Sequence, residues 1–353
     1  MGMSTVSSRA AAEPESDLLE VGRWQSEGAF ERVIGPHRAE LLAHCYRMLG
    51  SPADAEDAVQ ETLIRAWRAM PTLRTRASLR SWTYRIATNV CLTMIERRPK
   101  RMLPIEYGPA DDPDQVLAPP LAESIWLEPY PDGPFGLDAG ATSPEARYER
   151  RESVELAFTA ALQHLPARQR AVLLLRDVLG YPPAEIAASL DVPPTTVYSL
   201  LQRARQAVTD RLPSRSQQAN LRTIGDQRLR HVVERYVEAW DRGDIAAITA
   251  LLRADATLSM PPRSSWYRGR DDIGAFLAAA GVATPGRWQR VPLRVSGQLG
   301  FGVYGSCDDD SDSAHAIEVL TLDRRGRIAD ITSFQKPDLF AQFGLPSTRG
   351  EIR

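Results

Sequence analysis

SPADAEDAVQETLIRAWRAMPTLRTRASLRSWTYRIATNVCLTMIERR, at residues 51–98, is the stretch that decides the fold of the N-terminal part of this chain. Ser51 followed by Pro52 is a typical helix start, because serine can cap the free amides of the first turn and proline fits there without losing a hydrogen bond. Apolar residues then recur at helical spacing as far as Pro71, and a second helix is predicted at 79–96. The first helix is predicted to bury Ala55, Val59, Leu63, Ala66, Trp67 and Met70.

Two aromatic residues, Trp82 and Tyr84, lie on the second of these helices, which runs into a basic cluster at 97–101. Aromatic rings beside arginines can stack on unpaired bases while the cations hold phosphates. The same rings can equally be core residues of a helical bundle, since aromatic side chains dominate protein cores. The residues alone leave both alternatives open.

The strings SPADAEDAVQETLIRAWRAM and LRSWTYRIATNVCLTMIERR resemble region 2 of the extracytoplasmic-function sigma factors of bacterial RNA polymerase. The resemblance implies that the helix at 53–70 docks on the polymerase, and that the loop 72–78 with the next helix opens the −10 promoter element and captures a flipped base. Leu73 departs from the aromatic residue often found in the base pocket, so the captured base is not fixed. The implied −10 contacts are Leu73, Arg76, Arg80, Trp82, Arg85, Asn89, Arg97 and Arg98. The implied polymerase contacts are Asp54, Asp57, Gln60 and Glu61.

Further along the chain, a helix at 184–190, a three-residue turn and a longer helix at 194–209 form the pattern of a helix-turn-helix motif. Asp191 in the turn can adopt the left-handed backbone that such a turn needs. The longer helix has an apolar stripe at steps of four, three and four: Val197, Leu201, Ala204 and Val208. Its opposite face offers hydrogen-bond donors and cations, as a helix in a DNA major groove requires. Geometry alone also allows a purely structural helical hairpin.

The string LPARQRAVLLLRDVLGYPPAEIAASLDVPPTTVYSLLQRARQAV, at 165–208, resembles region 4 of the same sigma factors. This resemblance implies that the longer helix binds the −35 promoter element. Tyr198 and Leu200 stand where many relatives have basic residues, so the usual −35 sequence is not assumed. The implied −35 contacts are Thr195, Thr196, Tyr198, Ser199, Gln202, Arg203 and Arg205.

Charge is segregated along the chain. The region 2-like block, 23–102, has 14 basic and 8 acidic residues, and the region 4-like block, 147–215, has 10 basic and 7 acidic residues. Between them the tether, 103–146, holds nine acids, nine prolines and no lysine or arginine. Two basic blocks indicate a protein that holds nucleic acid at two points. The tether is predicted to be mostly extended, and the resemblance implies that it passes through the RNA path of the polymerase.

An apolar island, IWLEPYPD at 125–132, interrupts the tether, and such a cluster usually docks on another surface. A very similar string marks the sigma-G-like subgroup of these factors. Two docking places are open: the polymerase, or the C-terminal domain of this chain. The predicted docking residues are Trp126, Leu127, Pro129 and Tyr130.

Helices followed by strands are predicted over 216–346, which indicates an α+β domain with a curved sheet. Helices are expected at 232–240, 245–252 and 271–280, and strands at 256–260, 288–295, 299–307, 314–322 and 328–334. The strings RYVEAWDRGDIAAITALLRADATLSMPP and WYRGRDDIGAFL resemble the SnoaL-like branch of the nuclear-transport-factor-2-like superfamily.

Some SnoaL-like proteins are isomerases or cyclases that use a pocket carboxylate as a base. Here Asp241, Asp255 and Asp271 are explicable as helix or turn caps, so no catalytic residue is predicted. The resemblance instead implies a regulatory domain that contacts both sigma regions. The terminal string KPDLFAQFGLP resembles the end of such extensions, with regulatory residues Pro337, Asp338, Phe340 and Phe343.

Composition limits the remaining function classes. Cys45, Cys91 and Cys307 are far apart, so neither a disulfide framework nor a zinc site is predicted, and no metal or cofactor is expected. No apolar run is long enough to span a membrane and no export signal is visible, so the chain is predicted to be cytoplasmic.

The predicted organisation is a multidomain protein: a tail at 1–22, the two all-α blocks with the tether between them, the α+β domain at 216–346 and a tail at 347–353. The predicted function is an RNA polymerase sigma factor whose partners are core polymerase and promoter DNA. Two other functions stay open: a stand-alone helix-turn-helix regulator that binds duplex DNA, and a SnoaL-type enzyme fused to a DNA-binding module. A small ligand in the α+β domain is conceivable, but no residue was identified for it.

Overall fold

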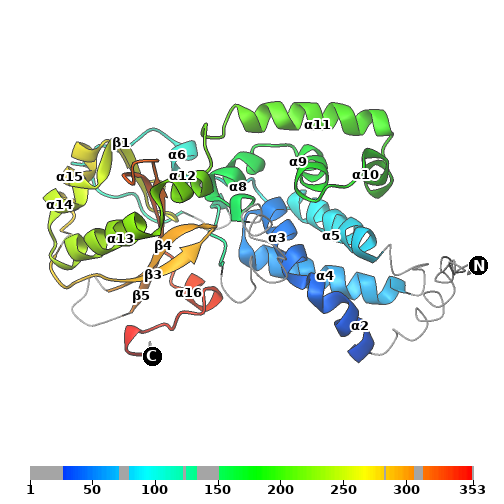
Figure 1. Ribbon diagram of the computed structural model, residues 1–353, viewed down its shortest axis with the longest axis horizontal. Coiled ribbons are helices and arrows are strands. Elements are labelled where there is room, and N and C mark those ends of the chain that lie inside the picture. Colours follow the sequence, from blue (N-terminus) through cyan, green and yellow to red (C-terminus); the bar gives the residue numbers. More distant parts are fainter. Residues whose placement is uncertain are drawn as a thin grey trace, which may run out of the picture.

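The computed structural model describes residues 27–70, 79–121, 125–132, 151–281, 284–305 and 313–351. Figure 1 shows an elongated molecule with a helical part at one end and an α+β domain at the other. The helical part contains α2 (Glu27–Ile34), η2 (Gly35–His37), α3 (Arg38–Leu49), α4 (Pro52–Ala69), α5 (Leu79–Ile95), α8 (Leu156–Gln163), α9 (Ala167–Leu173), the π-helical η6 (Leu174–Val178), α10 (Pro183–Leu190) and α11 (Pro194–Thr209). In the described part of the tether there is one short helix, α6 (Pro104–Tyr107).

Helix α4 begins as the sequence predicts. The Ser51 hydroxyl accepts a hydrogen bond from the Asp54 amide at 3.3 Å, and Pro52 lies in the first turn. The predicted buried face is confirmed for Ala55, Val59, Ala66 and Met70, while Leu63 is half-buried. The prediction that Trp67 is buried is wrong: it is 37% exposed. Its ring lies at the margin of the stripe, where α2 covers it only through an edge contact with Phe30 at 5.2 Å.

The two helical blocks share one hydrophobic core, whereas the sequence indicated separate modules. Residues of α3, α4 and α5 pack with residues of α8 to α11 in a single buried cluster. The buried guanidinium of Arg170 on α9 donates to the Met48 carbonyl of α3 and, at 2.6 Å, to the Gln163 side chain. The rings of Tyr84 and Tyr181 meet edge to face at 6.0 Å. Apolar burial across the blocks therefore holds them together.

The helix-turn-helix prediction is confirmed. Asp191 ends α10 in the left-handed conformation, with φ 53° and ψ 54°. The apolar stripe of α11 is buried at all of its predicted positions: Val197, Leu201, Ala204 and Val208.

The C-terminal domain contains α12 (Gln217–Ile224), α13 (Asp226–Asp241), α14 (Ile245–Ala250), β1 (Leu252–Ser259), β2 (Trp266–Arg268), α15 (Arg270–Ala279), β3 (Gln289–Val295), β4 (Gln298–Tyr304), β5 (Ala314–Leu322), β6 (Ile328–Phe334), α16 (Leu339–Gln342) and η7 (Arg349–Glu351). Its described strands form a mixed sheet in the order β2-β1-β6-β5-β4-β3, in which only β1 and β6 pair in parallel. The predicted α+β class is confirmed.

Two elements of this domain escaped the sequence analysis. Strand β2 has three residues, too few for an alternating pattern to be recognised. Helix α12 follows a stretch with linker composition and is capped by Ser216, whose hydroxyl accepts from the Ala219 amide at 3.2 Å. Asp244 caps α14, whereas Asp271, which the sequence offered as a cap, lies with Asp272 in the first turn of α15, whose N-cap is Gly269.

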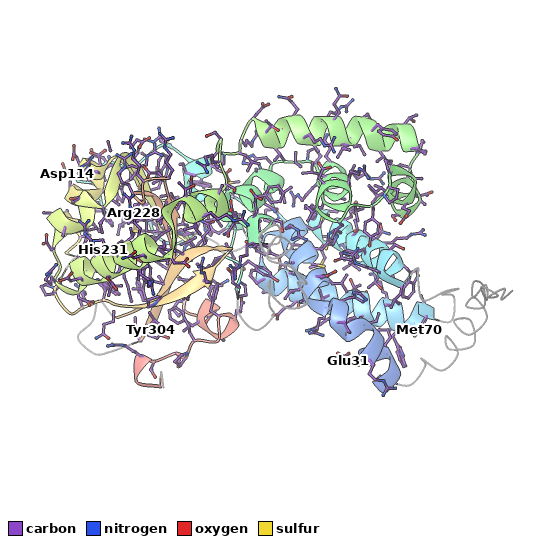
Figure 2. The ribbon with its side chains drawn as sticks, in the orientation of Figure 1. Glu31, Met70, Asp114, Arg228, His231 and Tyr304 are labelled. Atoms are coloured by element: carbon purple, nitrogen blue, oxygen red, sulfur yellow. The ribbon has the colours of Figure 1, made fainter. Side chains whose placement is uncertain are left out.

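The two faces of the sheet have different partners because strand side chains alternate between them. One face packs against α12 to α15, with Tyr236, Ile248 and Phe276 in the cluster. The other face packs against α16, α8 and part of the tether. Figure 2 labels Tyr304 on this second face, near α16, where its ring lies 5.0 Å from that of Phe340. The second face therefore connects the α+β domain to the helical part.

Candidate nucleic-acid interface

Helix α11 presents the predicted −35 residues to solvent. Tyr198 is 60% exposed, and Thr195, Ser199, Gln202 and Arg203 are also exposed, while Thr196 is half-buried. Arg205 is exposed and forms a bidentate ion pair with Asp177, at 2.9 and 2.6 Å. Since Asp177 belongs to the same block, this pair orients the guanidinium without attaching the helix to another part of the chain. Helix α11 lies along one edge of the molecule (Figure 1).

Helix α5 and the residues after it carry the predicted −10 contacts. Arg85, Asn89, Arg97 and Arg98 are exposed, whereas Arg80 and Trp82 are half-buried. Trp82 packs on the cluster of Phe30, Ala66 and Leu79, so it has a structural role in the bundle as well as an accessible edge. Leu73 and Arg76 lie outside the described residues.

Arg80 is held by contacts from two blocks. Its guanidinium donates to the Glu40 carboxylate of α3 at 3.2 Å and lies over the Tyr84 ring at 5.1 Å. It also lies 5.8 Å from the ring centre of Tyr181, which belongs to the region 4-like block. A guanidinium placed over aromatic rings is attracted by their negative faces. Part of the predicted −10 surface is therefore covered by the region 4-like block.

The predicted polymerase contacts on α4 divide into two groups. Asp57 and Gln60 are exposed, and Glu61 is half-buried in an ion pair with Arg65 at 2.6 Å. Asp54 does not match the expectation of a surface contact, because its carboxylate is buried and binds Arg98 and, at 2.6 Å, Arg101. The first turn of α4 faces the segment that follows α5. Arg98 and Arg101 of that segment neutralise the Asp54 carboxylate.

The tether docks on the region 2-like block through residues 125–132, the docking segment. Arg101 donates to the Trp126 carbonyl at 2.7 Å, the Tyr46 hydroxyl donates to the Glu128 carbonyl at 2.8 Å, and the Glu128 amide donates to the Gly50 carbonyl at 3.0 Å. Trp126, Leu127 and Tyr130 are buried, as is Pro129. The sequence left the polymerase and the C-terminal domain open as docking places, and it did not indicate this contact with the region 2-like block.

The C-terminal domain contacts the docking segment from the other side, through the turn between β3 and β4. The Ser296 amide donates to the Tyr130 carbonyl at 2.7 Å, and the Ser296 hydroxyl accepts from the Tyr130 amide at 2.9 Å. The Gly297 amide donates to the Asp132 carboxylate at 2.9 Å. Both turn residues have positive φ, 53° and 68°, as a two-residue hairpin turn of this hand requires. The sequence analysis did not predict that Ser296 and Gly297 bind the docking segment, because a Ser-Gly turn has no sequence feature that indicates such a contact.

The terminal motif completes this junction. Phe340 is buried in the same cluster as Leu127, Phe343 packs against it, and Pro337 and Asp338 are exposed. Lys336 forms an ion pair of 2.7 Å with Glu128 of the docking segment. At the start of the region 4-like block, the buried Glu155 carboxylate accepts from the Gln217 and Gln218 amides of α12, at 2.9 and 2.7 Å.

An earlier part of the tether lies along β2 and the loop before it. The Trp266 indole donates to the Gly108 carbonyl at 2.9 Å, and the Leu121 amide donates to the Pro262 carbonyl at 2.9 Å. Arg263 donates to the Ala118 carbonyl at 2.6 Å. The described residues of the tether are mostly irregular, yet many of them are bound to the rest of the chain.

Three further observations concern metal binding, the cysteine thiols and membrane-spanning helices. Among the described residues, no group of three or more His, Cys, Asp or Glu side chains is placed to hold a metal ion. Cys45 and Cys91 are buried free thiols, and Cys307 lies outside the described part. None of the described helices is both long and apolar enough to cross a lipid bilayer.

Comparison with known proteins gives three family matches along the chain. Residues 33–101 match sigma-70 region 2, residues 155–208 match sigma-70 region 4, and residues 233–331 match the SnoaL-like domain. These segments correspond to the α3–α5 bundle, the helix-turn-helix block and the α+β domain.

Two curated relatives match this chain over most of its length. The ECF RNA polymerase sigma factor SigG of Mycobacterium tuberculosis strain H37Rv is 40% identical over 326 residues, which cover 92% of this chain and 86% of SigG. SigJ of the same strain, also an ECF RNA polymerase sigma factor, is 28% identical over 89% of this chain and 94% of SigJ. The crystal structure of M. tuberculosis SigJ has the same overall fold, with a TM-score of 0.58 at 24% identity over 92% of this chain and all of that one. The chain belongs to the extracytoplasmic-function sigma factors of RNA polymerase, and to those that carry a C-terminal SnoaL-like domain.

Proposed function

We propose that this sigma factor directs core RNA polymerase to promoters through three surfaces of its helical part. The exposed face of α11 contacts the −35 element, α5 with the loop before it contacts the melted −10 element, and Asp57, Gln60 and Glu61 of α4 contact the polymerase. The exposed arginines of α5 and α11 support this proposal, since guanidinium groups bind phosphates and guanine edges bidentately.

We propose further that the packed arrangement is a resting state, and that the C-terminal domain maintains it by holding the docking segment. The observation that carries this proposal is the position of residues 125–132 between Gly50 on one side and the Ser296–Gly297 turn on the other. Removing Leu127 from its cluster would expose apolar surface of both the sheet and α8. The docking segment thus stabilises the joined blocks.

Promoter geometry supports the idea that the packed state is not the DNA-bound state. The −35 and −10 elements are about 25 base pairs apart, which is roughly 85 Å at about 3.4 Å per base pair. In the packed state the two blocks share a core, and Tyr84 and Tyr181 are in ring contact. A sigma factor that contacts both elements together must therefore separate the blocks and release the tether.

The tether acids have partners in this state. Glu128 pairs with Lys336, Asp132 accepts from the Gly297 amide, and Glu106 pairs with His164. We propose that release of the tether frees these carboxylates for the positively charged RNA path of the polymerase. Repulsion between the freed acids and DNA would keep the tether away from the promoter.

Run-off transcription with core polymerase and a promoter library tests the proposed activity. We expect products from a defined promoter class, and we expect Arg203→Ala to reduce them by about fivefold or more, since a bidentate base contact contributes about 1–3 kcal/mol. Arg211→Ala is the matched control, because Arg211 is equally exposed but lies beyond the predicted contact face. No product from any promoter, together with tight sequence-specific binding of duplex DNA by the full chain alone, would instead identify a stand-alone regulator.

A further inference from the structure

An open cavity of about 390 Å³ lies where the two helical blocks meet. Its region 2-like side is formed by Leu49, Asp54, Ile95 and residues 98–101, and its region 4-like side by residues 163–167 and Arg170. A cavity of roughly 150 Å³ accepts benzene, so this one has room for a molecule with about two rings. Because its wall comes from both blocks, the cavity is complete only while the blocks are packed together.

Positive charge exceeds negative charge at this cavity. Its described wall contains one carboxylate, that of Asp54, and four cations: Arg98, Lys100, Arg101 and Arg170. Glu106, which is not part of the described wall, pairs with His164, which is. Even when Glu106 is counted, four cations against two carboxylates leave a surplus of two positive charges.

Arg170 contributes a buried charge without an opposite charge. The residue is 4% exposed. Within the described part of the chain its guanidinium donates only to uncharged oxygens, those of Met48, Gln163 and Leu165. Burial lowers its pKa to about 10. Burying a charge is unfavourable unless an opposite charge lies near it, so an anion in the adjoining cavity would stabilise this guanidinium.

Lys100 contributes an exposed charge. In the described part of the chain its ammonium group makes one hydrogen bond, of 2.6 Å, to the uncharged Nδ1 of the His164 ring. Burial lowers the pKa of this ammonium group, and the charges of Arg211 and Arg170 lower it further, against the opposing effect of Glu106. Lys100 therefore has like charges nearby and donors to offer to a ligand.

We propose that this cavity is a binding site for an organic phosphate. The phosphate oxygens would accept hydrogen bonds from Lys100 and Arg98, which are both exposed. Arg98 binds Asp54 through Nη1, which leaves other donors of its guanidinium for a ligand. A phosphate monoester carries about −1.5 to −2 charge at pH 7, which matches the surplus of two, whereas one carboxylate would balance only half of it. The organic part would lie against the apolar side chains of the wall, which include Leu49, Ile95 and Leu165.

A ligand in this cavity would favour the packed arrangement of the blocks. A molecule that binds one state and not the other stabilises the state that it binds. Separation of the blocks would move residues 98–101 away from Arg170 and divide the site. An organic phosphate would therefore hold the sigma factor in its resting state. This consequence rests on the proposed function, whereas the binding itself does not.

Isothermal titration calorimetry of the full-length protein at low ionic strength tests the binding. Three compounds share the same base and sugar and differ in charge: AMP, cyclic AMP, which has a single charge, and adenosine, which has none. We expect AMP to bind saturably and cyclic AMP to bind roughly tenfold more weakly, the equivalent of about one charge-assisted hydrogen bond. Adenosine should bind more weakly still, and so should inorganic phosphate, which cannot contact the apolar wall. The titrations contain no polymerase, so their result is independent of the proposed transcription activity.

The substitution Lys100→Met removes one charge from the cavity, and it should weaken AMP binding roughly tenfold, while Lys100→Arg should retain it. Arg168→Met is the matched control, because Arg168 is exposed on α9 and is absent from the described wall. Equal binding of AMP and adenosine would overturn the phosphate assignment, and equal binding of AMP and inorganic phosphate would overturn the role of the apolar wall. Unchanged AMP binding by Lys100→Met would overturn the location, and no saturable binding of AMP at millimolar concentration would overturn the site.

A second variant tests the link to the packed state. Leu127→Asp places a charge in the apolar cluster that holds the docking segment, which should favour separated blocks. Since only the packed fraction of the molecules binds, this variant should bind AMP more weakly by about threefold or more. Equal binding by Leu127→Asp and the native chain would overturn the link between the ligand and the packed state.

Discussion

Helices α5 and α11 carry the two sets of predicted DNA contacts, yet the two contact faces differ in how far the rest of the chain covers them. The contact face of α11 is open to solvent, and its one ion pair, from Arg205 to Asp177, stays within the same block. On α5, Arg80 lies beneath Tyr181 of the other block, and Arg98 just beyond the helix is attached to Asp54. The polar contacts that join the blocks and the tether therefore concentrate at the region 2-like side.

This difference indicates where regulation acts. Duplex DNA could reach α11 in the packed state, because nothing in the described residues covers its exposed face. On the −10 surface, Tyr181 lies against Arg80, and the docking segment is bound to Gly50 of the same block. We infer that the packed state limits promoter melting more than it limits −35 binding.

Releasing the docking segment should give the largest effect. Leu127→Asp places a charge in an apolar cluster, and the unpaired buried carboxylate costs several kcal/mol, enough to favour the undocked tether. We expect run-off transcription to increase at least tenfold while binding of the isolated −35 duplex changes less than twofold. Val116→Asp is the control, since the same change at a tether residue that is 96% exposed should have no effect. Equal gains in both assays would contradict the distinction between α5 and α11.

A pH titration tests whether the C-terminal domain also holds the region 4-like block. Burial raises the pKa of Glu155 from 4.5 to about 7, despite the two amides that donate to it. Because the folded state binds this proton more tightly than the unfolded chain, the stabilisation is complete below pH 4.5 and is lost as the pH rises through about 7. The loss is about 3 kcal/mol.

Urea unfolding at pH 5 and pH 8 measures this loss for the native chain and for Glu155→Gln. The amide does not titrate, so the variant should lose less free energy of unfolding between the two values, and the difference between the proteins isolates Glu155 from other groups. The same loss in both proteins would mean that Glu155 is not responsible.

A glycine pair measures how closely the tether approaches the region 2-like block. Gly50 has φ +74°, and an added Cβ would lie 2.9 Å from Leu127 Cδ1. Gly180 has φ +76°, and a Cβ added at Gly180 would meet nothing within 4 Å. Alanine at either position costs about 1–2 kcal/mol, because both positions have a left-handed backbone. Only Gly50→Ala also pushes against Leu127 of the docking segment, so only this variant should raise transcription, by several-fold. Similar behaviour of the two variants would show that strain alone is responsible.

The smallest effect is expected at the ring that covers Arg80. Tyr181→Leu removes the cation–π contact at 5.8 Å and one aromatic pair at 6.0 Å, and at these long distances the two together contribute about 0.5–1 kcal/mol. We expect a two- to fivefold increase in open-complex formation, measured by 2-aminopurine fluorescence in the −10 element, with unchanged −35 binding. A decrease would indicate that Tyr181 assists melting.

Features that depend only on neighbouring residues are predicted well from the sequence. The Ser51 cap, the left-handed Asp191 and the buried stripe from Val197 to Val208 follow from short-range rules, and the structure confirms them. Long-range pairing was not predictable in this way. Asp54 was expected at the surface because its helix position is polar, but Arg101, 47 residues later, folds back to bind it.

The junction was the least predictable part of the molecule. Composition identified residues 125–132 as a docking segment, yet its partners Gly50 and Ser296 are a helix end and a hairpin turn without chemical signals of their own. The buried ion pair between Arg290 on β3 and Glu318 on β5 likewise forms only because the fold brings the two strands together. Such sites depend on topology, which residue spacing does not encode.

Single-molecule energy transfer between the two helical blocks tests the central claim most directly. Donor and acceptor dyes are attached through Arg68→Cys on α4 and Thr209→Cys at the end of α11, in a chain with Cys307→Ser, while Cys45 and Cys91 are buried. We predict one narrow, high-transfer population for the free protein, and a shift to low transfer on binding core polymerase and promoter DNA. A free protein with the same broad distribution as Leu127→Asp, or a polymerase complex with unchanged transfer, would contradict the account.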